Sequence, residues 1–202
     1  SRKGSLIAKR IFDFAISLLM TIILSPILLV LIIIIKLDDP GPAFFRQVRI
    51  TTYGRAFRIF KFRTMVVNAE ELGTQVTKEN DPRVTRIGNK LRKYRLDELP
   101  QLLNIITGDM SFVGTRPEVP RYVNCYSEEM LATLLLPAGV TSEASIMYKD
   151  ENELIGNAED PDKVYVEKVL PDKMRYNLDA LRNFSFWGEL KTMFRTVGAV
   201  LK

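Results

Sequence analysis

The sequence predicts an α+β protein that is mostly helical, with a membrane helix at its N-terminus and a small domain resting on the membrane surface. Three observations predict this fold. Residues 14–35 form an apolar run without a charge, flanked on both sides by basic residues. The remaining chain combines one hairpin pattern with several amphipathic helix patterns. We therefore expect a re-entrant membrane helix with its basic flank at 1–38, and a domain at the cytosolic face at 39–202, with a short antiparallel hairpin and interfacial amphipathic helices.

The composition excludes several kinds of chemistry. The 202 residues include no histidine and one cysteine, Cys125, so histidine chemistry and an internal disulfide are both absent. Reactive groups must come from carboxylates, lysine, tyrosine or the thiol, and Cys125 is interpreted as structural because it lacks a histidine partner. Residues 1–95 carry 18 Lys and Arg against 7 Asp and Glu, and residues 96–202 carry 11 against 17. The basic half suits anionic partners such as phosphates, lipid head groups or nucleic acid.

The apolar run is interrupted near its middle by Ser25 and Pro26. Pro26 removes one helical hydrogen bond and kinks the helix, and the Ser25 hydroxyl can satisfy the carbonyl that is set free. Two arrangements are open: a plain kinked transmembrane anchor, or a helix that enters the bilayer, breaks at Ser25-Pro26 and returns. Because basic flanks stay in the cytoplasm and both flanks are basic, the charge pattern favours the re-entrant form.

Two strand patterns, at 43–49 and 56–64, are separated by a turn signal at 51–54, which predicts a β-hairpin. Lys61 and Arg63 are two residues apart on the second strand and therefore share a face. Such a pair of cations can hold a phosphate, or can simply lie on a solvated strand face.

The hairpin is followed by a predicted short helix at 65–72, a polar loop at 77–82 and a basic amphipathic helix at 83–95. That helix leads directly to two adjacent carboxylates, Asp97 and Glu98.

Asp97 is predicted to be the N-cap of a helix at 98–107, with Pro100 in the first turn. A carboxylate at a helix N-terminus beside several cations stays ionised and faces a site that attracts anions. Asp97 is therefore a candidate nucleophile or metal ligand next to a bound phosphate. The alternative is that Asp97 only caps the helix and that Glu98 is a solvated first-turn acid.

A turn at 108–109 and a loop at 111–118 come next in the chain. Arg116 is held in that loop between Thr115 and Pro117, a setting that suits a bidentate contact to a phosphate or a base.

The rest of the chain is predicted to be helical, with a helix at 119–134 and an acidic segment of surface helices and loops at 143–172. A last helix at 184–201 has an aromatic-rich apolar face, which predicts either a helix lying in the membrane interface or one packing on the core. The apolar positions are Phe184, Trp187, Leu190, Phe194, Val197 and Leu201.

In this order, the motifs resemble the small monotopic phosphoglycosyl transferases, the bacterial sugar-transferase family that begins glycan assembly on a polyprenol carrier. The resemblance runs from about Lys9 to the C-terminus and depends on order and spacing, because each motif alone is weak. The motifs are the helix broken at Ser25-Pro26, Asp39-Pro-Gly-Pro-Ala-Phe-Phe-Arg-Gln-Val-Arg49, Lys61-Phe-Arg-Thr-Met65, Asp81-Pro-Arg-Val-Thr-Arg-Ile-Gly88, Leu96-Asp-Glu-Leu-Pro-Gln-Leu-Leu-Asn104, Gly108-Asp-Met-Ser-Phe-Val-Gly114 and Arg116-Pro-Glu118.

The resemblance implies a reaction and assigns residues to it. Asp97 matches the family's nucleophile, which attacks the β-phosphate of a UDP-sugar, releases UMP and forms an aspartyl phosphosugar intermediate. Polyprenol (undecaprenyl) phosphate then attacks the intermediate and gives a polyprenol diphosphate sugar, in a ping-pong order. Glu98 matches the partner acid, whose role is open among proton removal, orientation of Asp97 and metal binding. Residues 39–202 are thus expected to be the catalytic domain.

Magnesium is the family's cofactor, and Asp97 is expected to contact it. Thr115 stands where the family's Pro-Arg-Pro motif has its first proline, and residues 137–146 replace a Gly-rich stretch of many relatives. The loop's rigidity and the sugar are therefore left open. The predicted substrate-binding residues, assigned by the resemblance or by their charge, are Lys61, Arg63, Arg92, Arg116 and Pro117.

The expected partners are a UDP-sugar, polyprenol phosphate and the bilayer, at the cytosolic face of the bacterial inner membrane. No nucleic acid is expected, and a homodimer is left open. The competing hypothesis is a non-catalytic, membrane-anchored basic module that binds anionic lipid or nucleic acid. It explains the basic half but not the Asp97-Glu98 pair, and it predicts that Asp97→Asn leaves function intact while binding falls steeply with salt.

Overall fold

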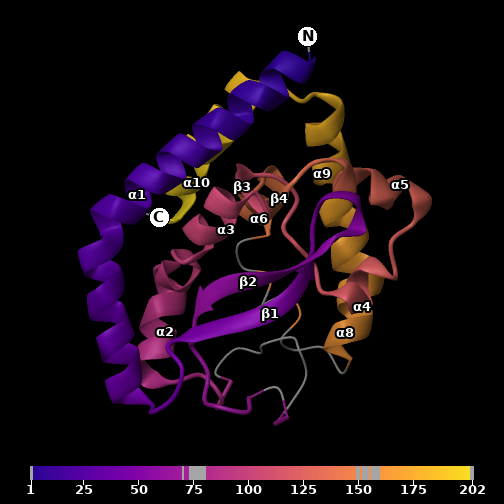
Figure 1. Cartoon of the computed structure of the whole chain (residues 1–202). Helices are drawn as coiled ribbons and strands as arrows, with labels where there is room; N and C mark the ends of the chain where they lie inside the picture. Colours follow the sequence, from indigo (N-terminus) through magenta and orange to yellow (C-terminus); the bar gives the residue numbers. More distant parts are fainter. Residues whose placement is uncertain are drawn as a thin grey trace.

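The computed structural model describes residues 2–69, 71–72, 81–148, 151, 155 and 160–200. The long N-terminal helix, α1 (Arg2–Asp38), contains Pro26 and remains helical through it. Pro26 has no N–H to donate to the Ile22 carbonyl, and the Ser25 hydroxyl donates to that carbonyl instead at 2.8 Å. The predicted role of Ser25 is confirmed. The helix changes direction midway along its length (Figure 1), as a proline inside a helix causes.

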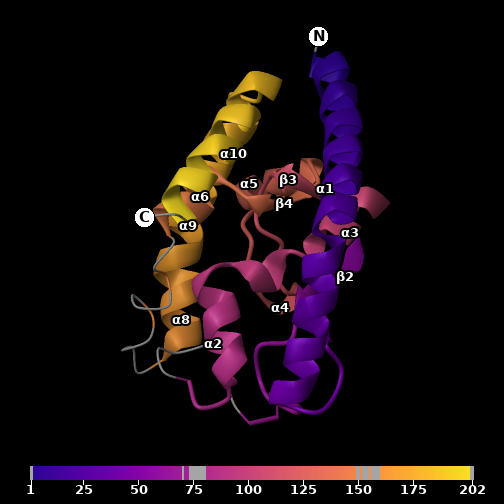
Figure 2. The same cartoon turned by 90° about the vertical axis from the view of Figure 1, so that its left-hand side faces the viewer.

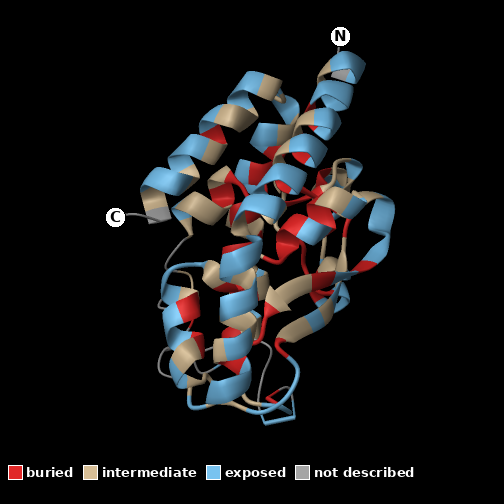
Figure 3. Ribbon diagram, turned by 60° about the vertical axis from the view of Figure 1, so that its left-hand side comes forward, coloured by how far each residue is buried: buried red, intermediate tan, exposed pale blue. Residues whose placement is uncertain are grey.

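The outer face of α1 is apolar and exposed, with Ile11 65%, Ile22 63% and Ile33 57% exposed. By length and composition the helix could cross a membrane. Only the inner face of α1 packs on the domain. Most of the helix is therefore exposed, and its buried positions are few and scattered (Figure 3).

The predicted hairpin is confirmed. Strands β1 (Phe44–Ile50) and β2 (Ala56–Phe62) pair antiparallel, with Phe44 opposite Phe62 and Ile50 opposite Ala56. A 3-10 turn, Thr52–Gly54, joins them. Phe57 and Ile59 of β2 pack in one buried cluster with Leu102 and Ile105 of α3 (Gln101–Thr107), and this packing fixes β2 next to the segment that carries Asp97.

A second sheet was not predicted. Strands β3 (Met110–Val113) and β4 (Ala138–Thr141) pair parallel, so the predicted loop at 111–118 is wrong for its first three residues. Each strand has only four residues, too short for an alternating pattern to be visible in the sequence. Gly139 allows the close approach, since a Cβ at this position would lie 2.1 Å from the backbone nitrogen of Gly114.

The short helix predicted at 65–72 is wrong within the described residues. Met65 forms an isolated antiparallel bridge with Val84, and turns follow. Most of the loop predicted at 77–82 lies outside the described residues. The bridge ties the end of the hairpin to the start of the next helix, a long-range contact that local sequence does not reveal.

The basic helix predicted at 83–95 is present but shorter, as α2 (Arg86–Lys93). Thr85 is its N-cap and accepts a hydrogen bond from the Gly88 N–H at 2.9 Å. Leu91 is buried with Phe62, which packs α2 against the hairpin and the C-terminal part of α1.

The helix predicted at 119–134 is interrupted, and the acidic segment predicted to lie on the surface contributes buried residues. Ile155, Tyr165, Val169 and Leu170 belong to a buried cluster that also contains Val119. The elements are α4 (Pro120–Val123), α5 (Glu128–Leu131), η3 (Ala132–Leu135), α6 (Glu143–Met147), α8 (Pro161–Val164), η4 (Tyr165–Val169) and α9 (Leu170–Arg182).

The last helix, α10 (Phe186–Val200), runs beside the N-terminal half of α1 (Figures 1 and 2). Phe186 contacts Phe12 of α1 edge-on, with ring centroids 5.6 Å apart. Trp187 and Phe194, on another side of α10, are 78% and 77% exposed. One predicted use is confirmed, because one side of the helix packs on the protein. The other side leaves large aromatic side chains exposed, and its place in the membrane interface stays a prediction. Leu201 lies outside the described residues.

Candidate active site

Asp97 and Glu98 lie in a short 3-10 turn, η2 (Leu96–Glu98), between α2 and α3. The predicted N-cap role of Asp97 is wrong: α3 begins at Gln101, and its N-cap is Pro100, which makes no side-chain cap bond. Arg95, just before the turn, has a left-handed backbone conformation with φ 55°. This conformation, uncommon outside glycine, ends α2 and redirects the chain into the turn, where Asp97 is only 8% exposed.

Glu98 is clamped by two cations from separate parts of the chain. Its Oε1 lies 3.0 Å from Lys61 Nζ on β2 and 2.6 Å from Arg116 Nη2 on the 115–118 loop. Burial alone would raise the pKa of Glu98, but the charges of Arg116 and Lys61 and the hydrogen bond from Arg116 bring that pKa well below its usual range. Glu98 is therefore an ionised structural centre around which β2, η2 and the loop meet.

Asp97 has a different environment although it is the adjacent residue. Within the described residues no hydrogen bond to its carboxylate is found, while Lys61, Arg92 and Arg116 are close enough to act on its charge. Burial raises the pKa of Asp97, the positive charge of Lys61 opposes this, and the negative charge of Glu98 adds to it. The result is a buried, relatively basic carboxylate that faces cations without being bonded to any of them.

Arg92 and Pro117, two of the predicted binding residues, are each held by a further contact. Arg92 Nε donates to the Thr64 hydroxyl at 2.9 Å, so the guanidinium is held near Asp97 from the side of α2. Pro117 is buried, and its carbonyl accepts a hydrogen bond from Arg49 Nη1 at 3.1 Å. These contacts fix two of the predicted binding residues through the hairpin.

The loop before Arg116 is held by β4 in spite of the threonine at position 115. The Thr115 carbonyl accepts from the Gly139 N–H at 2.9 Å, and the Gly114 N–H donates to the Thr141 carbonyl at 3.0 Å. The backbone of the loop is thus fixed by sheet hydrogen bonds, which do not require a proline at position 115.

The Arg63 side chain does not lie free beside Lys61 to bind a phosphate, because it is bonded to other groups of the protein. Its guanidinium binds the Asp39 carboxylate and the carbonyls of Asp39 and Pro42, and the residue is 7% exposed. Arg63 therefore ties the end of α1 to the hairpin, while Lys61 binds Glu98. Ser25 and Pro26 lie in the middle of α1, within its exposed surface.

The residues fit a magnesium ion held mainly by substrate. No cluster of three or more potential ligand side chains is found in the described part of the chain. Magnesium in phosphoryl-transfer sites commonly uses one or two carboxylates together with substrate phosphate oxygens. Within the described residues, Asp97 offers one carboxylate without a hydrogen bond, whereas the near oxygen of Glu98 is occupied by Lys61 and Arg116. Asp97 and the phosphate oxygens of a diphosphate would together fit such an ion.

Three residues of the site were not singled out from the sequence. Thr64 lies in the Lys61–Met65 motif and Arg95 in the basic helix, but nothing in their spacing indicates the hydrogen bond of Thr64 or the left-handed conformation of Arg95. Glu118 belongs to the Arg116-Pro-Glu118 motif, which assigns it no role. Its side chain is buried and bonded to Tyr165, and the sequence gives no sign of that long-range partner.

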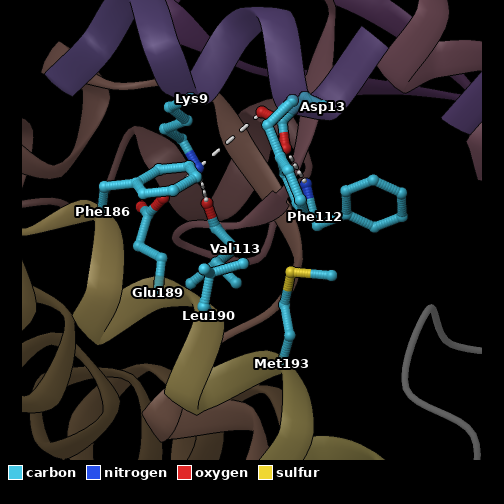
Figure 4. A pocket seen from close by; sticks show the side chains of 9 residues that line it. Lys9, Asp13, Phe112, Val113, Phe186, Glu189, Leu190 and Met193 are labelled. Atoms are coloured by element: carbon cyan, nitrogen blue, oxygen red, sulfur yellow. Dashed lines mark hydrogen bonds and ion pairs between the residues drawn. The ribbon is translucent and has the colours of Figure 1, made fainter. Parts of the chain in front are cut away.

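A second charged cluster lies between α1, β3 and α10 (Figure 4). Lys9 Nζ is 2.6 Å from Glu189, 3.8 Å from Asp13 and 3.0 Å from the Val113 carbonyl. We call Lys9, Asp13 and Glu189 the Lys9 cluster. The recess beside it has a volume of about 10 Å³, room for about one water molecule, so it does not accommodate a nucleotide sugar.

The known proteins that resemble this chain include sugar transferases and sugar-phosphate transferases. The profile of the family described as bacterial sugar transferase matches residues 4–202. The chain is 34% identical, over 96% of its length, to a UDP-N-acetylgalactosamine-undecaprenyl-phosphate N-acetylgalactosaminephosphotransferase of Aeromonas hydrophila. It is 36% identical over 94% of its length, and 35% identical over 96%, to two UDP-glucose:undecaprenyl-phosphate glucose-1-phosphate transferases, from Escherichia coli K12 and Caulobacter vibrioides respectively. The chain spans 43%, 39% and 69% of the length of these three relatives.

Proposed function

The chain belongs to the bacterial sugar transferase family. From this membership and the geometry around Asp97, we propose that it transfers a phosphosugar from a UDP-sugar to undecaprenyl phosphate or another polyprenol phosphate. The products are UMP and a polyprenol diphosphate sugar. The observation that carries the proposal is the contrast within one turn: Glu98 is neutralised by Lys61 and Arg116, and Asp97 beside it is buried without a hydrogen bond in the described part of the chain.

The first half-reaction uses Asp97 as the nucleophile. A carboxylate oxygen of Asp97 forms a bond to the β-phosphorus of the UDP-sugar. The bond from that phosphorus to the bridging oxygen breaks, and this oxygen leaves with the bonding electrons as part of UMP. Burial keeps the pKa of Asp97 above its usual value, which makes the ionised carboxylate a stronger nucleophile than an exposed one.

The second half-reaction releases Asp97. A phosphate oxygen of the polyprenol phosphate attacks the phosphorus of the aspartyl phosphosugar, and the bond to the Asp97 oxygen breaks. The Asp97 carboxylate is restored, so the order is ping-pong. Lys61, Arg92 and Arg116 supply fixed positive charge for the diphosphate in both steps, and a magnesium ion bound by Asp97 and the diphosphate would neutralise further phosphate charge.

Glu98 orients cations in this mechanism. Because the pKa of Glu98 is held well below its usual range, the group is ionised at neutral pH and is a weak base. Its place between Lys61 and Arg116 supports a role in holding those two side chains on the same side of Asp97. Proton removal by Glu98 is not needed, since a polyprenol phosphate oxygen is already ionised.

The geometry of α1 supports a re-entrant placement. Near its N-terminus, Arg10 donates to the Ile105 and Ile106 carbonyls at 2.6 and 2.9 Å, which satisfies the C-terminal carbonyls of α3. Near its C-terminus, Ile35 packs with Phe62 and Leu91. Both ends of one helix thus contact the same small domain, whereas a straight span would separate its ends by the thickness of the bilayer.

The placement can be tested by labelling. In a Cys125→Ser background, single cysteines replace the exposed residues Lys3 and Leu37. We expect a membrane-impermeant maleimide to label both from the cytosolic side of inverted vesicles. If one of the two positions were labelled only from the other side of the membrane, α1 would be a transmembrane span.

The reaction is tested by UMP release from a panel of UDP-sugars, with a short polyprenol phosphate and magnesium in detergent. At least one sugar is expected to give UMP and a polyprenol diphosphate sugar, and Asp97→Asn is expected to abolish both. If no sugar gives UMP, or if Asp97→Asn matches the wild type, the proposal is lost. A non-catalytic basic module would instead bind lipid equally well in both forms, with a steep dependence on salt.

A further inference from the structure

A buried polar cluster lies directly behind the loop that carries Arg116. The Tyr165 hydroxyl donates to the Glu118 carboxylate, and Lys173 Nζ lies 3.2 Å from the Tyr165 oxygen and 3.9 Å from Glu118. Lys173 also pairs with Glu151 at 2.8 Å. We call Glu118, Tyr165, Lys173 and Glu151 the Glu118 cluster. The first three are 7%, 4% and 5% exposed, so the cluster lies within the protein interior.

The cluster is joined to the site through the backbone of the loop. Glu118 follows Arg116 by two residues, and its carbonyl accepts from the Ile50 N–H at 3.0 Å. Arg49 Nη1 donates to the Pro117 carbonyl and lies 3.8 Å from the Glu118 carboxylate. The loop is therefore held on one side by the hairpin and on the other by the side chain of Glu118, and Arg116 is free to extend to Glu98 at 2.6 Å.

The helix that carries Tyr165 is locally widened at that residue. Between α8 and α9 the chain forms a π-turn, Tyr165–Val169, in which the Leu170 N–H donates to the Tyr165 carbonyl five residues earlier. Single π-turns are rare and occur frequently at functional sites. The Tyr165 ring packs 4.8 Å from the Tyr122 ring, centroid to centroid, so its hydroxyl is held in a defined place.

A buried carboxylate such as Glu118 needs its partners. Removing one partner leaves an uncompensated charge, which either costs several kcal/mol or drives a local rearrangement. Because the Glu118 backbone is continuous with Pro117 and Arg116, a rearrangement there moves Arg116. A shift of about 1 Å in a catalytic group can cost a hundredfold in rate.

We propose that Glu118, Tyr165 and Lys173 are positioning residues, which hold the 115–118 loop so that Arg116 meets Glu98 beside Asp97. The inference rests on the proposed function and extends it: among the described residues, the C-terminal helices make no contact with Asp97 or Glu98, but they set the position of a cation that does. The Tyr165 hydroxyl bonds directly to Glu118 although it is distant from Arg116 along the chain, and it gives the cleanest test.

The test compares two tyrosines in the same buried cluster. Tyr165→Phe removes the hydroxyl that binds Glu118. Tyr122→Phe removes a hydroxyl that binds Asp162 at 2.5 Å, whereas the hydroxyl of the neighbouring Tyr165 ring binds Glu118. We expect Tyr165→Phe to lower kcat for UMP release about tenfold or more with little change in KM, and Tyr122→Phe to stay within about twofold of the wild type.

A double-mutant cycle separates positioning from general loss of structure. In an Arg116→Lys background, the effect of Tyr165→Phe is expected to shrink to less than about twofold, because two changes that act through one contact are not additive. If Tyr165→Phe unfolds the protein, Glu118→Gln replaces it in the cycle, since the amide keeps an acceptor for the tyrosine and removes the charge.

Two outcomes would overturn the inference while the wild type is active. One is a Tyr165→Phe enzyme that matches Tyr122→Phe in kcat. The other is an equal loss of rate from Tyr165→Phe in both Arg116 backgrounds, which would show a role unconnected with Arg116. A wild-type protein that releases no UMP from any UDP-sugar would instead refute the proposed function, and this inference with it.

Discussion

The Lys9 cluster and the site around Asp97 each join distant parts of this chain, and they differ in what they leave unpaired. In the Lys9 cluster one cation is shared by Asp13 and Glu189 and also binds the Val113 carbonyl. In the site, Lys61 and Arg116 close on Glu98, and the adjacent Asp97 stays without a hydrogen bond in the described residues. Since burying an unpaired carboxylate is costly, the first cluster is expected to stabilise the fold, and the second to keep a reactive group at some cost in stability.

The strongest test of this contrast is Asp97→Asn. We expect a loss of at least about 10³-fold in kcat/KM, because an amide cannot act as the nucleophile. The free energy of unfolding should stay equal or rise: burial raises the pKa of Asp97, so its ionised form opposes folding at neutral pH and a neutral side chain removes that cost. UMP release and thermal unfolding in the same detergent measure the two effects. A large loss of stability would make Asp97 a structural residue.

The reverse pattern is expected for Lys9→Met. Removing the shared cation leaves two largely buried carboxylates and should lower the free energy of unfolding by about 3 kcal/mol. The rate per folded molecule should change less than about twofold, since none of the three groups belongs to the site. Denaturant titration followed by UMP assays on the remaining folded fraction checks this, with exposed Lys191→Met on α10 as the matched control. A variant that is stable but inactive would remove the distinction between the clusters.

The loss of activity in Glu98→Gln should lie between the losses in Asp97→Asn and Lys9→Met. It leaves Lys61 and Arg116 without their common carboxylate, and kcat should fall about a hundredfold as the cations lose their orientation. Glu143→Gln, which removes a carboxylate bonded to Thr192 and Arg195 away from the site, is the control and should keep nearly full activity. Full activity in Glu98→Gln would show that the cations hold their positions without it.

The smallest expected effect is on pH dependence. Asp97 reacts when ionised, so the rate should fall as pH falls through its pKa, which burial keeps above the usual value for aspartate. Removing the negative charge of Glu98 lowers the pKa of Asp97. The acid limb of the kcat/KM profile should therefore move to lower pH in Glu98→Gln. Movement to higher pH would contradict the assignment of charges around Asp97.

The sequence predicted the parts of this molecule that depend on local pattern. The apolar helix, the action of Ser25 at Pro26 and the hairpin all follow from composition and spacing. The family membership is confirmed, whereas the roles of Asp97 and magnesium stay predictions. Lys61, Glu98 and Arg116 do lie together, but Arg63, which resembles Lys61 in sequence, binds Asp39 instead.

The failures come from one local backbone conformation and from long-range contacts, neither of which is visible in the sequence pattern. Asp97 is not an N-cap, because the left-handed Arg95 and a 3-10 turn delay the helix to Gln101. The β3–β4 pair depends on close backbone approach between segments distant in sequence. The acidic segment is partly buried because Ile155, Tyr165 and Leu170 pack in a cluster with Val119, and no pattern within that segment shows these distant contacts.

The central claim is that Asp97 becomes covalently attached to the phosphosugar. The most direct measurement is mass spectrometry of the protein incubated with its UDP-sugar and magnesium, without polyprenol phosphate, and then digested. We predict an added sugar phosphate on the peptide that contains Asp97, lost when polyprenol phosphate is supplied and missing in Asp97→Asn. UMP release at the wild-type rate with the adduct on another residue, or from the Asp97→Asn protein, would contradict the account.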